Sequence, residues 1–119
     1  MSLSGWDADK KIKLTIAAAD VDSALTDFPV LVNLGTSSGK GSFDASAVFD
    51  ELTSDANRKK IAIEIGDTGV QCYCEIERWD DANETAQLWV KIPSVSASAA
   101  TILHLYYDSA HADNTTYVG

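Results

Sequence analysis

The chain has 119 residues, of which 45% are apolar, and this length fits a single domain. Folding buries about two thirds of the surface that an unfolded chain of this size exposes, so no metal or disulfide staple is needed. The 18 Asp and Glu residues outnumber the 9 Lys and Arg residues, which gives a formal net charge of −9. This charge repels phosphate backbones and anionic membrane surfaces, and it argues against nucleic acid as a partner.

The start of the chain lacks the apolar stretch that a secretory signal peptide carries. No apolar run approaches the roughly 20 residues that are needed to span a bilayer. We therefore expect a protein that is made in the cytoplasm without a signal peptide and that does not insert into a membrane.

Apolar and polar residues alternate with a period of two along most of the chain, which is the pattern of half-buried β-strands. In chain order, strands are predicted at residues 11–16, 29–34, 60–65, 70–79, 86–92 and 101–107. The turn at Gly66–Gly69 suits a tight hairpin, because glycine reaches positive φ at little steric cost. Pro93 is expected to end the fifth strand, since it lacks the N–H group that a ladder needs.

The segment Phe43–Leu52 breaks this alternation, because its apolar residues are spaced by three and four. We expect a short helix here, with Asp44 at its N-terminus. The predicted fold class is therefore all-β: a jelly-roll-like antiparallel β-sandwich with one short helix.

The alternation also predicts which residues face each other across the hairpins, because a register must keep the apolar side chains on one side. The predicted pairs are Ile65 with Val70, Ile63 with Cys72, and Ile61 with Cys74. In the following hairpin, the same rule places Lys91 opposite Tyr73 or Glu75.

Two cysteines, Cys72 and Cys74, fall two residues apart on one face of a predicted strand. Their Cα atoms would be about 6.5 to 7 Å apart with parallel Cβ vectors, which disfavours a disulfide bridge. Zinc binding by this pair with His104 is an alternative, but both thiols share a face with Val70, and buried cysteine behaves as a small hydrophobe. We expect two free thiols in the core and no metal site.

Signals for catalysis are weak. Glu75 and Glu77 share a strand face at a spacing that a glycosidase pair could use, but most such pairs belong to solvated sheet faces. His104 and His111 have no nucleophile in a recognisable elbow to support a triad. We expect no catalytic residue, no cofactor and no enzymatic activity.

Aromatic residues give the clearest binding signal. Trp89 lies between two residues predicted to face inward, so its ring points to the other face, and Tyr73 and Tyr106 also lie opposite the predicted core set. Exposed aromatic rings on a sheet can stack on sugars, and such patches commonly mark contact sites. The candidate carbohydrate-binding residues are Trp89, Tyr73, Tyr106 and Trp79. The alternative is that these rings lie under loops, under the short helix or against another domain.

Five sequence motifs occur in a fixed order between Trp6 and about Asn114. They are Trp6 with a Lys-rich strand after it, FPVLVNLG (28–35), CEIERWDDAN (74–83), LWVKIP (88–93) and LHLYYD (103–108). This order resembles a domain of unknown function found in bacterial, archaeal and phage surface proteins, often just ahead of a concanavalin-like or laminin-G-like lectin module. The chain is most similar to the version found in prophage regions.

The resemblance implies a β-sandwich accessory module, and it assigns no catalytic residue. Two functions follow as expectations. The first is a non-catalytic structural or adhesion module of a phage virion or cell-surface protein, which supports a neighbouring lectin-like domain of the same chain. The alternative is a carbohydrate-binding module that uses exposed aromatic residues, with a glycan as its partner. After assembly, the protein would be associated with a virion or a surface.

The domain is expected to cover residues 1–113. The polar run after it, residues 114–119, reads as the start of a linker to a C-terminal region.

Overall fold

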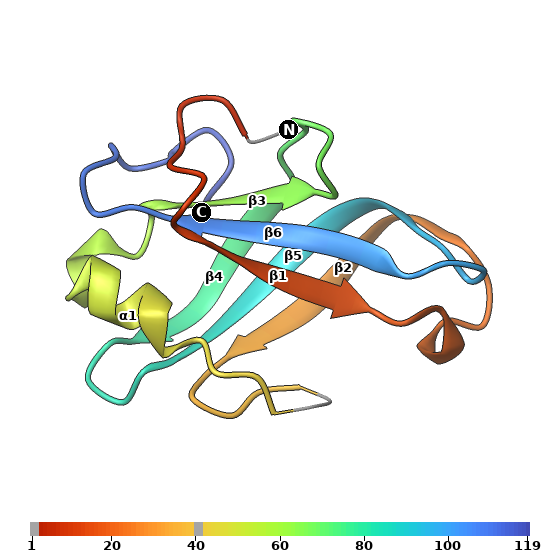
Figure 1. Ribbon diagram of the computed structural model, residues 1–119, viewed down its shortest axis with the longest axis horizontal. Coiled ribbons are helices and arrows are strands. Elements are labelled where there is room, and N and C mark those ends of the chain that lie inside the picture. Colours follow the sequence, from red (N-terminus) through yellow and green to blue (C-terminus); the bar gives the residue numbers. More distant parts are fainter. Residues whose placement is uncertain (1–2, 40–41) are drawn as a thin grey trace.

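The computed structural model describes residues 3–39 and 42–119, so part of the segment on which the signal-peptide expectation rests lies outside the described residues. Two three-stranded antiparallel sheets pack face to face (Figure 1). One sheet has the order β1 (Lys11–Ile16), β6 (Thr101–Tyr107) and β3 (Ile61–Ile65); the other has the order β2 (Leu25–Leu34), β5 (Thr85–Val95) and β4 (Tyr73–Asp80). The predicted all-β antiparallel sandwich with one short helix is confirmed.

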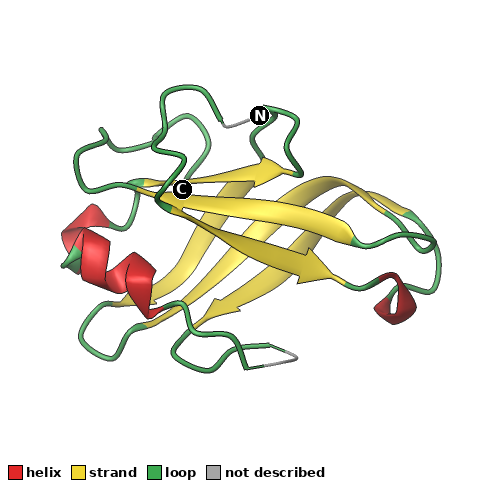
Figure 2. Cartoon of the chain, in the orientation of Figure 1, coloured by secondary structure: helices red, strands yellow, loops and turns green. Residues whose placement is uncertain are grey.

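Three short helical segments lie outside the sheets (Figure 2). They are α1 (Ser46–Leu52), which closes one end of the sandwich, and the 3₁₀ turns η1 (Ala18–Asp20) and η2 (Asp55–Asn57). The predicted helix is thus present but starts later than Phe43. Asp44 lies just before it and accepts a hydrogen bond from the backbone N–H of Ser46 at 2.8 Å. None of the helices in the two described ranges is long and apolar enough to cross a membrane.

The core lies between the two sheets and under α1. Central strands supply most of it, because β5 and β6 each have a neighbour on both sides. Their inward residues are fully or almost fully buried and match the predicted alternation: Leu88, Val90, Ile92, Leu103, Leu105 and Tyr107. Three apolar residues of α1 complete the core at one end: Val48, Phe49 and Leu52.

The hairpin after β3 is paired as predicted near its turn. Ile65 donates a backbone hydrogen bond to Val70 at 3.0 Å, and Cys72 donates one to Ile63 at 2.7 Å. Val70 nevertheless lies at the turn with 52% of its surface exposed, so its expected place on the buried face was wrong.

The third predicted pair, Ile61 with Cys74, does not form. After the turn, the returning chain stays hydrogen-bonded to β3 as far as Cys72, and from Tyr73 it joins the other sheet, where Cys74 pairs with Val90. Ile61 pairs instead with Tyr107 of β6. The next hairpin follows the prediction, because Lys91 lies directly opposite Tyr73.

The register of β4 shifts between Ile76 and Arg78, where the strand contains an irregularity of the β-bulge type. Such an irregularity reverses the inward and outward alternation beyond it. Trp79 therefore turns into the core, where it is 8% exposed and its ring centroid lies 5.1 Å from that of Phe49.

Pro93 does not end β5, which continues to Val95. Beyond Lys91, β5 has lost β4 as a neighbour and pairs only with β2. A proline is tolerated where one side of the strand needs no ladder hydrogen bond.

The N-terminal arm covers the outer face of the β1–β6–β3 sheet. Leu3, Ala62 and Tyr106 form a small second core there, with Trp6 packed against it. Trp6 also stacks on His111, with ring centroids 3.7 Å apart. This sheet is therefore closed on both faces in the region of Tyr106.

Residues 114–119 are part of the packed domain. Val118 is 4% exposed and bridges Cys74 in parallel, and Gly119 exchanges backbone hydrogen bonds with β4 through Cys74 and Ile76. The Asn114 amide donates to the carbonyl of Ile61 at 3.0 Å. The expected domain boundary at residue 113 thus does not coincide with a break in packing.

Candidate binding groove

A groove of about 560 Å³ lies on the outer face of the β2–β5–β4 sheet, next to the C-terminal segment. The sheet supplies its floor, and residues 115–119 form a wall. Its aromatic and charged lining residues are Tyr73, Trp89, Tyr117, Asp27, Glu75 and Lys91. We call this site the aromatic groove.

Strand register determines which side chains meet in the aromatic groove. Across the three strands, Lys91 lies between Pro29 and Tyr73. In the next row, Trp89 lies between Leu31 of β2 and Glu75 of β4. These positions alternate with buried ones along β5, so their side chains point away from the core.

Trp89 is 39% exposed, and its ring is tethered at one edge. The indole Nε1–H donates a hydrogen bond to Glu77 Oε1 at 3.3 Å. Glu77 is the residue at which the register of β4 shifts. The irregularity in β4 thus provides a partner for the indole, while a large part of Trp89 stays accessible.

Tyr73 is 57% exposed and contacts a second tyrosine from the C-terminal segment. The ring centroids of Tyr73 and Tyr117 are 5.0 Å apart, with the ring planes at 36°. Tyr117 was not predicted, because it lies in the run interpreted as a linker and has no periodic pattern around it. The signal that could have identified it is the apolar pair Tyr117–Val118 after a polar stretch.

Charged side chains of both signs line the aromatic groove. Asp27 and Glu75 carry carboxylates, and Lys91 carries the ammonium group. Among the described residues, none of the three has an ion-pair partner. They are thus available to a ligand.

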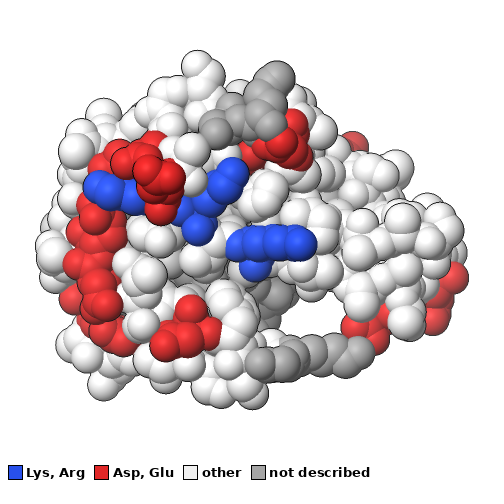
Figure 3. Space-filling view, viewed as in Figure 1, with Lys and Arg blue, Asp and Glu red and all other residues white. Residues whose placement is uncertain are grey.

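Over the chain as a whole, acidic side chains outnumber basic ones. On the face drawn in Figure 3, Asp and Glu side chains gather at the end of the molecule where α1 lies. Burial raises the pKa of Glu84 in this region, and the neighbouring carboxylate of Asp50 raises it further. The protein therefore presents a mainly negative surface to an approaching ligand.

Two of the four predicted aromatic residues do not belong to the groove. Tyr106 is fully buried under the N-terminal arm, where its hydroxyl accepts a hydrogen bond from the backbone N–H of Leu3 and donates one to Glu64, each at 3.0 Å. Trp79 is buried against Phe49. Neither ring is accessible for stacking on a sugar, whereas Tyr73 and Trp89 both line the aromatic groove.

A family model matches slightly less than half of the chain, in the part that holds most of the aromatic groove. Residues 61–118 match the model of a family described as Domain of unknown function (DUF2341). The match runs from the start of β3 to Val118 and includes Tyr73, Trp89 and Tyr117. No curated protein and no solved structure matches the chain.

Both cysteines lie within the DUF2341 match and are free and buried. Burial raises the pKa of Cys72 to about 11 and that of Cys74 to about 12. His104 lies elsewhere, with Nδ1 2.6 Å from the carbonyl oxygen of Gly66 and 3.7 Å from Glu64. In residues 3–39 and 42–119, no group of three or more His, Cys, Asp or Glu side chains is placed to hold a metal ion.

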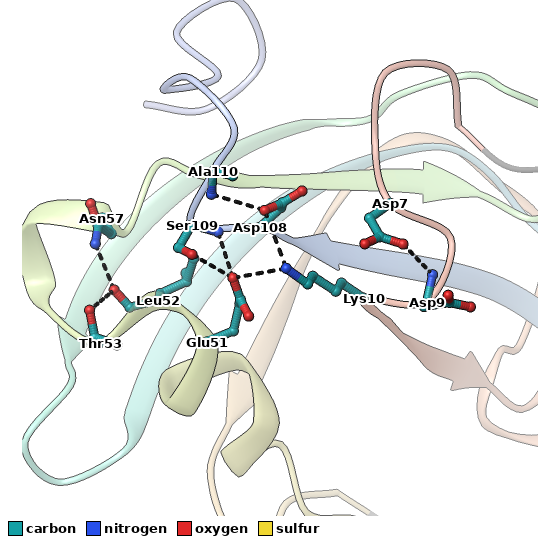
Figure 4. Close-up of polar contacts among 10 residues, drawn as sticks. All are labelled: Asp7, Asp9, Lys10, Glu51, Leu52, Thr53, Asn57, Asp108, Ser109 and Ala110. Carbon is teal, nitrogen blue, oxygen red and sulfur yellow. Dashed lines mark hydrogen bonds and ion pairs between the residues drawn. The ribbon is translucent and has the colours of Figure 1, made fainter.

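A polar cluster connects α1 to the segment that follows β6 (Figure 4). Of its members, Asp108 and Ser109 lie within the DUF2341 match. Glu51 accepts hydrogen bonds from the Ser109 hydroxyl at 2.5 Å, the Ser109 N–H at 2.9 Å and Lys10 Nζ at 3.3 Å. Lys10 also lies 3.6 Å from Asp108. These bonds, chiefly those from Ser109, lower the pKa of Glu51 to about 2. The Ser109 hydroxyl is thus held as a donor to a carboxylate, which is a structural role.

Proposed function

We propose that this protein is a non-catalytic carbohydrate-binding module and that the aromatic groove is its binding site. The observation that carries the proposal is the presence of Tyr73, Trp89 and Tyr117 in one groove on an open sheet face. Aromatic rings bury apolar surface of a ligand with little loss of side-chain entropy, because they rotate about only two χ angles. Carboxylates and an ammonium group beside such rings suit the hydroxyl groups of a sugar.

The contrast between the two sheets supports the proposal. The N-terminal arm closes the outer face of the β1–β6–β3 sheet around Tyr106, so the aromatic residue there is used for packing. The outer face of the β2–β5–β4 sheet instead leaves three large apolar side chains exposed: Leu31, Tyr73 and Trp89. Exposed apolar clusters beside polar groups are typical of binding surfaces.

The chemistry of the potential nucleophiles supports a non-catalytic role. Both thiols are buried with raised pKa values, which keeps them protonated at neutral pH. The Ser109 hydroxyl donates to Glu51. Glu77, one member of the carboxylate pair considered above, accepts the hydrogen bond of Trp89.

A role as a structural or adhesion module, which supports a lectin-like domain of the same chain on a phage virion or cell surface, is a second proposal. It rests on the family resemblance and on Phe28 and Leu31, which are 43% and 40% exposed on the edge strand β2. The two side chains lie on opposite faces of β2, so a neighbouring domain would have to pack along the edge of this strand to cover both. Protection of β2 from hydrogen exchange in a longer fragment, compared with this chain alone, tests that role.

The carbohydrate-binding proposal is tested on a glycan array, followed by titration calorimetry with the strongest binder. Trp89→Ala and Tyr73→Ala should each weaken binding. Val70→Ala is the matched control, because Val70 is 52% exposed but lies outside the aromatic groove. An array without any specific binder, or equal binding by all three variants, would contradict the proposal.

A further inference from the structure

We infer that Asp27 is a ligand-contacting residue of the aromatic groove and that the groove selects neutral oligosaccharides over acidic ones. The inference rests on the proposed function, because it specifies which carbohydrates the same groove accepts. Asp27 lies on β2, whereas Tyr73 lies on β4, the other edge strand of the same sheet.

Asp27 occupies an interruption in the ladder between β2 and β5. Thr26 pairs with Ser94 and Phe28 pairs with Ile92, but the position of Asp27 opposite Pro93 is unpaired. Its φ is 48°, in the left-handed region that Asp tolerates better than most residues. Unusual backbone conformations of this kind cluster at ligand sites.

Pro93 does not cause the interruption, because its nitrogen has the same orientation as those of Lys91 and Trp89 and points toward the side that β4 has left, not toward β2. Pro93 therefore also does not explain why the residue opposite it is an aspartate. Glycine adopts a positive φ at no steric cost, so a purely structural requirement at this position would favour glycine. The carboxylate of Asp27 lines the aromatic groove instead, without an ion-pair partner among the described residues.

The groove is long enough for more than one sugar unit. Asp27 lies at the level of Pro93, and Glu75 pairs with Trp89, so the two carboxylates are separated by four residues of β5. This separation is roughly 13 Å along the strand at about 3.3 Å per residue. Lys91 lies between them. The hydroxyl groups of an extended oligosaccharide can therefore donate hydrogen bonds to a carboxylate at each end and accept one from Lys91 in the middle.

Charge decides between neutral and acidic sugars. Two carboxylates and one ammonium group line the groove, and the whole chain carries a net charge of −9. A uronic acid unit would bring a further negative charge beside Asp27 or Glu75, and like charges at an interface suppress binding. Neutral units satisfy the same acceptors without this repulsion.

The test compares neutral galactose oligomers with galacturonic acid oligomers of the same length, together with the corresponding mannose and mannuronic acid pair. Titration calorimetry is run on the full chain and on Asp27→Asn, which keeps the shape and tolerates a positive φ. Asp9→Asn is the matched control, because it removes one negative charge from the N-terminal arm on the other side of the sandwich. Asp27→Gly tests the backbone separately.

We expect at least one neutral oligomer to bind about tenfold or more tightly than its acidic counterpart. Asp27→Asn should weaken neutral binding by about tenfold, as expected when a hydrogen bond to a charged acceptor is lost, and Asp9→Asn should not change it. Asp27→Gly should weaken binding while leaving the unfolding midpoint unchanged or raised.

Three results overturn the inference in different ways. Equal or tighter binding of the acidic oligomers overturns the neutral preference but leaves the carbohydrate-binding function intact. Unchanged affinity in Asp27→Asn removes Asp27 from the site. Absence of binding to all four oligomer types and to a glycan array refutes the proposed function, and the inference fails with it.

Discussion

Trp89 donates its indole N–H to Glu77 at 3.3 Å, and Glu77 is the residue at which the register of β4 shifts. The same irregularity that turns Trp79 into the core thus places a hydrogen-bond partner beside Trp89. The burial of Trp79 and the hydrogen bond of Trp89 therefore both depend on the irregularity in β4. A regular β4 would retain neither arrangement.

The first prediction concerns the stability of Trp89 variants. Because 39% of Trp89 is exposed, Trp89→Ala should lower the free energy of unfolding by only about 1 kcal/mol, far less than truncation of a buried aromatic ring. Trp89→Phe should retain most stability and part of the glycan binding, since an aromatic ring remains while the bond to Glu77 and part of the stacking surface are lost. Guanidinium titrations followed by circular dichroism measure both. A loss of 3 kcal/mol or more in Trp89→Ala, of the order seen for buried aromatic residues, would show that this ring is part of the core.

Alternation was sufficient to predict the six strands approximately and most of the residues between the sheets. Leu88, Val90 and Ile92 are buried as expected, because a central strand with a regular ladder keeps its period of two. Alternation failed at Trp79, since no local signal in the sequence marks the irregularity at Glu77. It failed in a different way at Tyr106: the face was right, but the period of a strand does not reveal that the N-terminal arm covers that face.

The candidate site was only half predictable for a related reason. Tyr73 and Trp89 follow from strand parity, but their proximity to Tyr117 depends on a contact between β4 and the end of the chain. Such long-range contacts leave no periodic trace. The course of the chain from β3 into the other sheet at Tyr73 was missed for the same reason.

The second prediction concerns the pH dependence of the Glu51 cluster. The folded-state pKa of about 2 lies below the ordinary value of 4.5, so ionised Glu51 stabilises the fold above about pH 4.5. This contribution should fall progressively between pH 4.5 and pH 2 as the carboxylate becomes protonated. Glu51→Gln should therefore lower the free energy of unfolding at pH 7 by about 1 to 2 kcal/mol, with the difference shrinking toward pH 2.

Denaturant titrations of wild type and Glu51→Gln at several pH values measure this effect, with Asp9→Asn as the exposed control. A difference between wild type and Glu51→Gln that stays constant from pH 7 to pH 2 would exclude titration of Glu51 as its source.

The third prediction concerns the two thiols. Since the thiolate is the reactive form and burial raises the pKa values to about 11 and 12, Cys72 and Cys74 should not react with Ellman's reagent at pH 8 in the folded protein. In guanidinium, both should react and no disulfide should be found. Rapid labelling of the native chain would show that the sandwich opens readily near β4.

The last prediction concerns Tyr106, which joins the N-terminal arm to the β1–β6–β3 sheet. Its hydroxyl accepts from the Leu3 N–H and donates to Glu64, a carboxylate with no exposed surface that also accepts from the Gly69 N–H at 2.7 Å. Tyr106→Phe preserves the ring but deprives both buried partners of a hydrogen bond. Leaving such groups unsatisfied costs about 1 to 3 kcal/mol, so the free energy of unfolding should fall by that amount.

Tyr73→Phe is the matched control for Tyr106→Phe, because Tyr73 is 57% exposed and its hydroxyl makes no hydrogen bond with the described part of the chain. It should leave stability within about 0.5 kcal/mol of wild type. Hydrogen exchange adds a readout for the arm: the amide of Leu3 should exchange faster in Tyr106→Phe, while amides of β5 exchange as in wild type unless the whole domain is destabilised. If Tyr106→Phe were as stable as Tyr73→Phe and the Leu3 amide remained protected, the arm would be held by the packing of Leu3 and Trp6 alone.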